Sequence, residues 1–252
     1  MRCARRICAL GWLAALAAPL LHAEGGPPML TDDPGTPGDG RWEINLAALS
    51  ENAAGTETYE LPLVDLNYGV GDRLQLKIET PWVITRGAAG DRSGVGNGLA
   101  GVKWRFYDGG DDGWRVSTYP QVEFNPGGAR SSRHGLADPG TSWLLPIEVE
   151  HKFGEIDLDV EAGRWRRSAG RPDTWIGGVV VGHEVAKGFE LMFELHDESA
   201  VHGSASELVA NLGARYDVSE RFTVLASAGR DLHDTLGARA ALVTYAGLQL
   251  HL

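Results

Sequence analysis

Apolar and polar residues alternate in short segments through most of the chain, from about residue 41 to residue 252. In residues 73–84, for example, Leu74 and Leu76 share one face while Gln75 and Lys77 share the other. A period of two is the pattern of a β-strand with two unlike faces. The strands expected on this criterion are residues 42–49, 59–68, 73–84, 100–106, 114–124, 142–152, 156–165, 175–185, 189–196, 208–216, 222–229 and 240–252.

The connections between these segments alternate between short and long. Residues 69–72 and 153–154 form tight joints, whereas residues 50–57, 87–98 and 125–140 form long ones. Outer-membrane barrels have an even number of strands, with short periplasmic turns and longer outer loops. We therefore predict an all-β fold, an up-and-down antiparallel transmembrane β-barrel of about 12 strands over residues 41–252, with both termini on the periplasmic side.

Four prolines within the expected strands oppose a fully regular barrel. Pro62, Pro81, Pro120 and Pro146 cannot donate a ladder hydrogen bond, and proline is normally kept to edges or bulges. A closed barrel has no edges. We therefore expect these residues at bulges that face a wet lumen or near strand ends.

The first forty residues have a different composition. Arg2, Arg5 and Arg6 precede an apolar stretch that ends in Leu21, a stretch shorter than a membrane helix needs. Residues 1–23 are therefore expected to be a cleaved signal peptide. Residues 24–40 are rich in proline, glycine and aspartate, and are expected to be either an exposed periplasmic segment or a partial plug in the barrel.

Composition excludes several kinds of chemistry. Cys3 and Cys8 both lie in the expected signal peptide, so the remaining chain has no thiol. The formal net charge is −11, and removal of the signal arginines makes it more negative. Nucleic acid is therefore not an expected partner. We expect no metal site and no cofactor.

Two stretches carry a resemblance to a known family. Residues 28–38, PMLTDDPGTPG, are followed by Trp42, and residues 94–98, GVGNG, lead into the strand of residues 101–106. Together they resemble the outer-membrane barrels named for the meta-pathway of phenol degradation, with Asn97 in place of that family's aspartate. The resemblance implies a transporter or channel of the cell outer membrane. Its expected partners are membrane lipid, the barrel-assembly machinery and a small solute.

Charged residues at alternate positions are the candidate lumen lining. The basic candidates are Arg73, Lys77, Lys103, Arg105, Arg115, Arg215 and Arg239. The acidic candidates are Glu148, Glu150, Asp157, Asp159, Glu161, Glu190 and Glu194. Opposed basic and acidic walls would create a field that orients polar solutes, whereas charges that merely pair would fill a narrow barrel. Both interpretations remain open from the sequence.

The expected function is passive passage of small solutes, with aromatic or other hydrophobic compounds as one class. An enzyme is not expected, although His196-Asp197 and His233-Asp234 at the expected outer rim could serve as acid/base pairs of an outer-membrane hydrolase. A soluble periplasmic β-sandwich that binds a ligand is the remaining alternative, because alternation alone also fits a soluble sheet.

Overall fold

The computed structural model describes residues 26–88, 90–110 and 113–252, so the expected signal peptide lies outside the described part. The described residues form strands and one short helix. In chain order these are β1 (Trp42–Ala53), β2 (Thr56–Val70), β3 (Leu74–Arg86), β4 (Arg92–Val95), β5 (Gly98–Asp108), β6 (Arg115–Thr118), β7 (Gln121–Phe124), α1 (Gly128–Arg133), β8 (Thr141–Phe153), β9 (Ile156–Arg167), β10 (Thr174–Ala186), β11 (Phe189–Ala200), β12 (Ser206–Ser219), β13 (Phe222–Asp234) and β14 (Ala240–His251).

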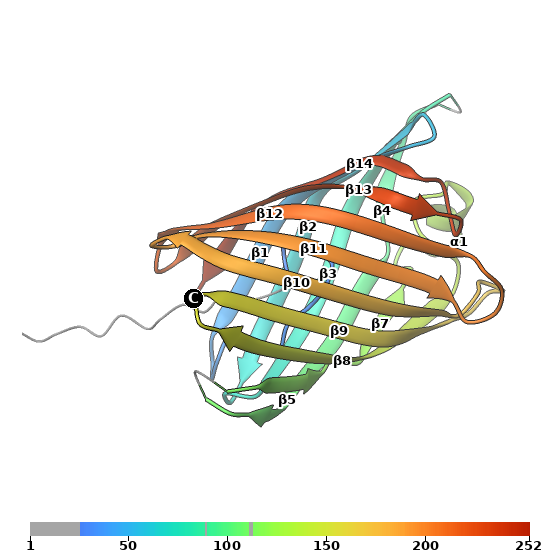
Figure 1. The fold of residues 1–252 in the computed structure, drawn as a ribbon. Coiled ribbons are helices and arrows are strands. Elements are labelled where there is room, and N and C mark those ends of the chain that lie inside the picture. The colour runs from blue at the N-terminus through green and yellow to red at the C-terminus, as the bar shows by residue number, and fades with distance from the viewer. Residues whose placement is uncertain (1–25, 89, 111–112) are drawn as a thin grey trace, which may run out of the picture.

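The sheet closes on itself as a barrel (Figure 1). β1 pairs with β14, β3 pairs with β5, and each of these ladders is antiparallel. β6 and β7 both lie between β5 and β8 and form two halves of one interrupted strand. The short β4 pairs with the same edge of β3 as β5 does, beyond the end of β5. The described chain is thus a closed 12-stranded antiparallel barrel, which confirms the predicted fold class and strand number.

The outer wall of the barrel is apolar and the inner wall is polar. On β8, Trp143 and Leu145 are 59% and 65% exposed, whereas Ser142 and Glu148 on the other face are fully buried. Large exposed apolar residues recur in this way on the other long strands. Lipid is the medium that such a wall suits, and a closed barrel satisfies its backbone groups without water. The molecule is a membrane β-barrel, and the alternative of a soluble β-sandwich is wrong.

The connections differ at the two ends of the barrel (Figure 1). The end that carries the C-terminus has tight turns, such as Gly154-Glu155 between β8 and β9. The other end carries the β7–β8 connection with α1 and the β3–β5 connection with β4. One expectation was wrong, because β1 and β2 are joined by only Ala54 and Gly55, both with positive φ. The two strands instead extend beyond the expected bounds, since their polar outer ends continue the ladder.

Two of the four prolines coincide with irregularities in the ladder. Pro62 lies in a bulge of β2, where the register against β3 shifts between Glu60 and Leu63. Pro120 lies in the interruption between β6 and β7, and its carbonyl accepts a hydrogen bond from the Val102 N–H at 3.0 Å. The wall therefore closes although proline supplies no donor at these positions.

The other two prolines lie beside those irregularities. Pro81 pairs with Leu63 across the β2 bulge, and Pro146 on β8 lies opposite the break between β6 and β7. The Pro146 carbonyl accepts from the Thr118 hydroxyl at 2.7 Å.

Among the described residues, no helix has the length and apolar character needed to cross a membrane.

Candidate functional site

The interior of the barrel is the candidate site, because buried polar side chains from almost every strand meet there. Its uncharged members hydrogen-bond to one another and to carboxylates. Asn45 donates to Asp65 at 3.1 Å, and Gln75 donates to Asn67 at 2.7 Å. A polar interior of this kind is typical of barrels that hold water or polar solutes, or that are filled by other parts of the chain.

Five of the seven basic candidates lie on the inner wall or close to it. Lys77, Lys103, Arg105, Arg115 and Arg215 each have side chains less than 15% exposed.

The other two basic candidates are corrections. Arg73 is exposed in the turn before β3, because β3 begins one residue later than predicted. Arg239 is exposed in the connection between β13 and β14, where its guanidinium bonds the backbone carbonyls of Asp231 and Leu232. Neither side chain is part of the wall.

The seven acidic candidates are all buried in the barrel interior, on three strands. Glu148 and Glu150 belong to β8, and the remaining five belong to β9 and β11: Asp157, Asp159, Glu161, Glu190 and Glu194. Each is at most 7% exposed. A carboxylate is expensive to bury unless a partner compensates its charge, so the contacts of these groups indicate what the interior holds.

Many of the interior charges are paired. Lys103 lies 3.8 Å from Glu148, and Arg115 bonds Glu150. Lys152 lies 3.2 Å from Asp157. Elsewhere in the interior, Lys77 lies 3.4 Å from Asp65 and 3.0 Å from Glu79, and Arg215 lies 4.0 Å from Glu190. The structure therefore favours charge pairing over two separate walls of opposite sign.

The N-terminal segment, residues 26–40, lies inside the barrel. It hydrogen-bonds to interior carboxylates that the ion pairs described above do not include. Its tip is formed by Leu30 and Thr31, whose backbone N–H groups donate to the Glu194 carboxylate at 2.9 and 2.6 Å. The next N–H, of Asp32, donates to Glu161 at 3.1 Å. Figure 1 shows this dark blue segment within the ring of strands.

Lys103 contacts the part of the segment that follows the tip. Its ammonium donates to the Asp32 carboxylate at 2.7 Å and to the Asp33 carbonyl, and lies 4.8 Å from the ring of Tyr119. The part that precedes the tip contacts Arg215, which donates to the Pro27 carbonyl at 3.0 Å. Ser227 donates to the Pro28 carbonyl at 2.9 Å. The segment is thus attached to strands around the barrel.

Two inward-facing glycines leave the space that this segment occupies. A Cβ atom added at Gly178 would lie 2.9 Å from the Cβ of Thr31, and one added at Gly213 would collide with the terminal methyl of Met29. Met29 also packs with the buried Val180 and Met192. Because any larger residue would overlap the segment, these glycines fit an inner wall shaped around it.

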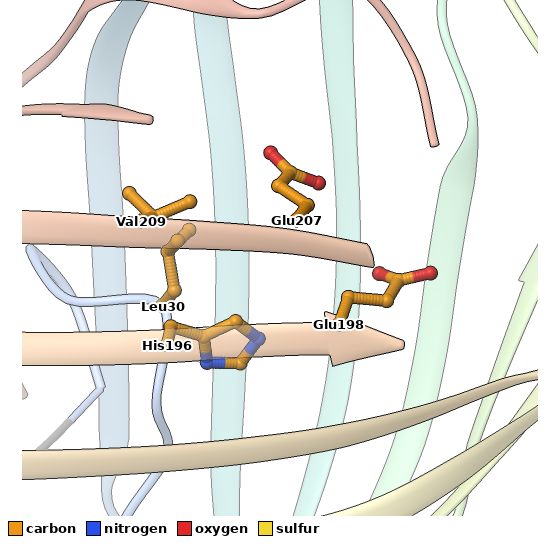
Figure 2. A pocket seen from close by; sticks show the side chains of 5 residues that line it. All are labelled: Leu30, His196, Glu198, Glu207 and Val209. Atoms are coloured by element: carbon orange, nitrogen blue, oxygen red, sulfur yellow. The ribbon is translucent and has the colours of Figure 1, made fainter. Parts of the chain in front are cut away.

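A cavity of about 220 Å³ lies on the loop side of the segment tip (Figure 2). Leu30 of the tip, His196 and Glu198 of β11, and Glu207 and Val209 of β12 line it. The Thr31 hydroxyl lies 3.3 Å from His196 Nδ1. The cavity therefore lies between the tip of the N-terminal segment and the barrel wall.

Sequence reasoning missed several interior residues that carry these contacts. Asp65, Asn211 and Asp231 are buried, and Asn211 donates to Glu194 at 2.6 Å. Period-two alternation within their strands could have found them, since each shares a face with other buried positions. Nothing in the sequence indicated that Gly178 and Gly213 contact residues about 150 to 180 positions away.

The His-Asp neighbours considered as alternative acid/base pairs do not assemble. Asp197 accepts from the Ser199 hydroxyl at 2.7 Å, and Asp234 accepts from the backbone N–H groups of Leu236 and Gly237. In the described part of the chain, no hydrogen bond joins His196 or His233 to its neighbouring aspartate. The geometry gives no support to a hydrolase built on them.

The fold is similar to several solved structures. The COG4313 outer membrane channel from Pseudomonas putida F1 superposes with a TM-score of 0.65 and 14% identity, over 85% of this chain and 96% of that one. The NanC porin gives 0.61 and 8% over 83% and 100%, and the KdgM porin gives 0.57 and 7% over 82% and 98%. No profile of a known protein family and no curated protein matches the chain. The chain therefore has the fold of outer-membrane β-barrel channels and porins.

Proposed function

We propose that the protein is a passive outer-membrane channel for small solutes, and that residues 26–40 of its own chain narrow the lumen. The observation that carries this proposal is a closed barrel with an apolar outer wall and a polar interior, in which a segment that is not part of the wall occupies the lumen. Membrane lipid and the barrel-assembly machinery would be its partners, and residues 1–23 would be removed on export.

The size of the barrel supports this role. Eight strands enclose an interior that side chains can fill, and 16 to 18 strands enclose an open aqueous channel. Twelve strands lie between these limits, so wall side chains alone need not fill the interior. Residues 26–40 would occupy part of the remaining space, and their displacement would leave a wider polar passage.

The attachment of the segment is suited to reversible movement. It consists mostly of hydrogen bonds and ion pairs to interior carboxylates and cations, with Met29 as an apolar contact. Water can replace polar partners at limited net cost, since even a hydrogen bond to a charged group contributes only about 1.5–3 kcal/mol net. A segment held in this way could leave the lumen without unfolding the barrel.

The likeness to barrels named for the meta-pathway of phenol degradation suggests aromatic compounds, and Leu30 and Val209 give the cavity an apolar part. We propose small organic solutes with a compact apolar group as the class to test first.

The test is conductance and permeation of the detergent-refolded chain, residues 24–252. We expect stepwise single-channel currents in planar bilayers and faster swelling of proteoliposomes in small organic solutes than in a trisaccharide. A protein that inserts and shows heat-modifiable migration, but neither conducts nor admits solute, would overturn the proposal.

A further inference from the structure

We propose that the cavity above the N-terminal segment is a binding site for a small organic cation, an ammonium group on a compact apolar body. The inference deepens the proposed function, and rests on it to the extent that the site lies on the path of a solute entering from the loop side. It is carried by the way β11 and β12 place their side chains around the cavity (Figure 2) and by the carboxyl groups of β13 that pair beside them.

The residues that line the cavity from β11 and β12 form two successive rows with their ladder partners on β13. The first row consists of the paired residues His196, Val209 and Asp231, and the second consists of Glu198, Glu207 and Asp234. Residues directly opposite each other in an antiparallel ladder project to the same face. Asp231 therefore belongs to the same inner face as Val209, and the second row brings three carboxyl groups together.

The positive charge available to these carboxylates is incomplete. Arg167 lies 2.6 Å from Glu198 and compensates it. In the described part of the chain, Glu207 has neither a hydrogen bond nor an ion pair, and its electrostatic neighbours are other carboxylates, among them Glu198 and Asp231. Arg239 is close to Asp231 but gives its bonds to backbone carbonyls.

A second observation points to a missing partner. Asp231 is only 2% exposed, and one of its carboxylate oxygens accepts from the Ala240 N–H at 2.5 Å. The other oxygen, Oδ1, is buried and has no hydrogen-bond partner. An unsatisfied buried charged oxygen is costly, and a cation in the adjacent cavity would reduce that cost.

The lining selects the class of cation. Leu30 at the tip of the segment and Val209 on the wall offer apolar contacts, while Glu207 and Glu198 offer the charge. No set of three or more histidine, aspartate or glutamate side chains in the described residues is arranged to hold a metal ion. A volume of about 220 Å³ is below the usual range for drug-sized ligands. A protonated amine with a single small ring fits these limits.

The experiment is a calorimetric titration of the refolded chain in detergent at pH 7 with benzylammonium. A titration of empty micelles serves as the blank. Benzyl alcohol has a similar size without the charge, and benzoate has the opposite charge. We expect saturable one-to-one binding of benzylammonium only. Glu207→Gln, which removes a charge that no other residue of the described chain bonds, should weaken binding about tenfold or more.

Asp231→Asn should weaken binding in the same direction, and Glu155→Gln, on an exposed turn at the other end of the barrel, should leave it unchanged. Heat-modifiable migration establishes that each variant is folded. If Asp231→Asn does not fold, Glu207→Gln alone carries the test. Absence of saturable benzylammonium binding, equal binding of benzyl alcohol, or an unaltered Glu207→Gln would overturn the inference. Binding does not require conduction, so a chain that binds without conducting would refute only the proposed function.

Discussion

Glu194 is the side chain on which the attachment of the N-terminal tip most depends. Its carboxylate accepts the N–H groups of Leu30 and Thr31, and a third bond from Asn211 orients it. Glu194→Gln keeps the shape of the side chain but removes the charge, and its amide nitrogen cannot accept a hydrogen bond. Both N–H groups donate to Oε1, and the Asn211 amide donates to Oε2. With Oε1 retained as the glutamine oxygen, both N–H groups keep an acceptor, but that acceptor is neutral.

The magnitude follows from these bonds. Hydrogen bonds to charged groups contribute about 1.5–3 kcal/mol each, against about 1 kcal/mol for neutral ones. Replacing the charged acceptor of both bonds by a neutral one should reduce the free energy of attachment by about 2 kcal/mol. Because 1.4 kcal/mol is a factor of ten, the detached population should increase by about thirtyfold. Asp157→Asn is the matched control, since Asp157 is equally buried but bonds Lys152 instead.

Two assays read out detachment. The first is the frequency of large open events in single-channel recordings, which should increase in Glu194→Gln and not in the control. The second uses Met29→Cys as the only thiol of the processed chain, because Cys3 and Cys8 lie in the expected signal peptide. Its labelling by a charged thiol reagent should accelerate in parallel. If Glu194→Gln matches the control in both assays, the hydrogen bonds do not hold the segment in place and the reasoning fails.

Three further predictions concern the same segment and the interior charges. The double variant Thr31→Cys/Gly178→Cys should form a disulfide that suppresses large openings until a reductant is added, because the two Cβ positions lie within about 1 Å of disulfide geometry. Large openings that are equally frequent before and after reduction would contradict this prediction. Gly213→Val should displace Met29 and raise the labelling of a cysteine placed at Leu30, whereas Gly177→Val, where an added Cβ meets nothing, should not. Lys103→Met leaves Asp32 and Glu148 without their shared cation, so urea unfolding should show a loss of about 3–5 kcal/mol; a loss below 1 kcal/mol would mean that the pairing is dispensable.

The sequence predicted the wall of the barrel well for a physical reason. Lipid outside and polar groups inside impose a strict period of two, so positions such as Leu145 and Glu148 show their faces without any structure. Errors occurred where that constraint ends. Arg73 and Arg239 lie just beyond a strand, and the Ala54-Gly55 turn follows strands that continue outside the apolar band.

The contents of the lumen could not be predicted in the same way. Residues 24–40 were expected to be either an exposed segment or a partial plug, and their composition alone does not decide between these states. The contacts of residues 26–40 with Glu194, Glu161 and Lys103 join positions far apart in the chain. No local pattern encodes such contacts, and the glycines that make room for the segment look like ordinary turn or strand glycines in the sequence.

The most direct measurement compares the single-channel conductance of residues 24–252 with that of a chain that lacks residues 26–38, both refolded and inserted in planar bilayers. The account predicts small or brief openings for the longer chain, and larger, sustained openings for the shorter one. Equal conductance in the two chains, or folded and inserted barrels that never conduct, would contradict the claim that this barrel is a channel narrowed by its own N-terminal segment.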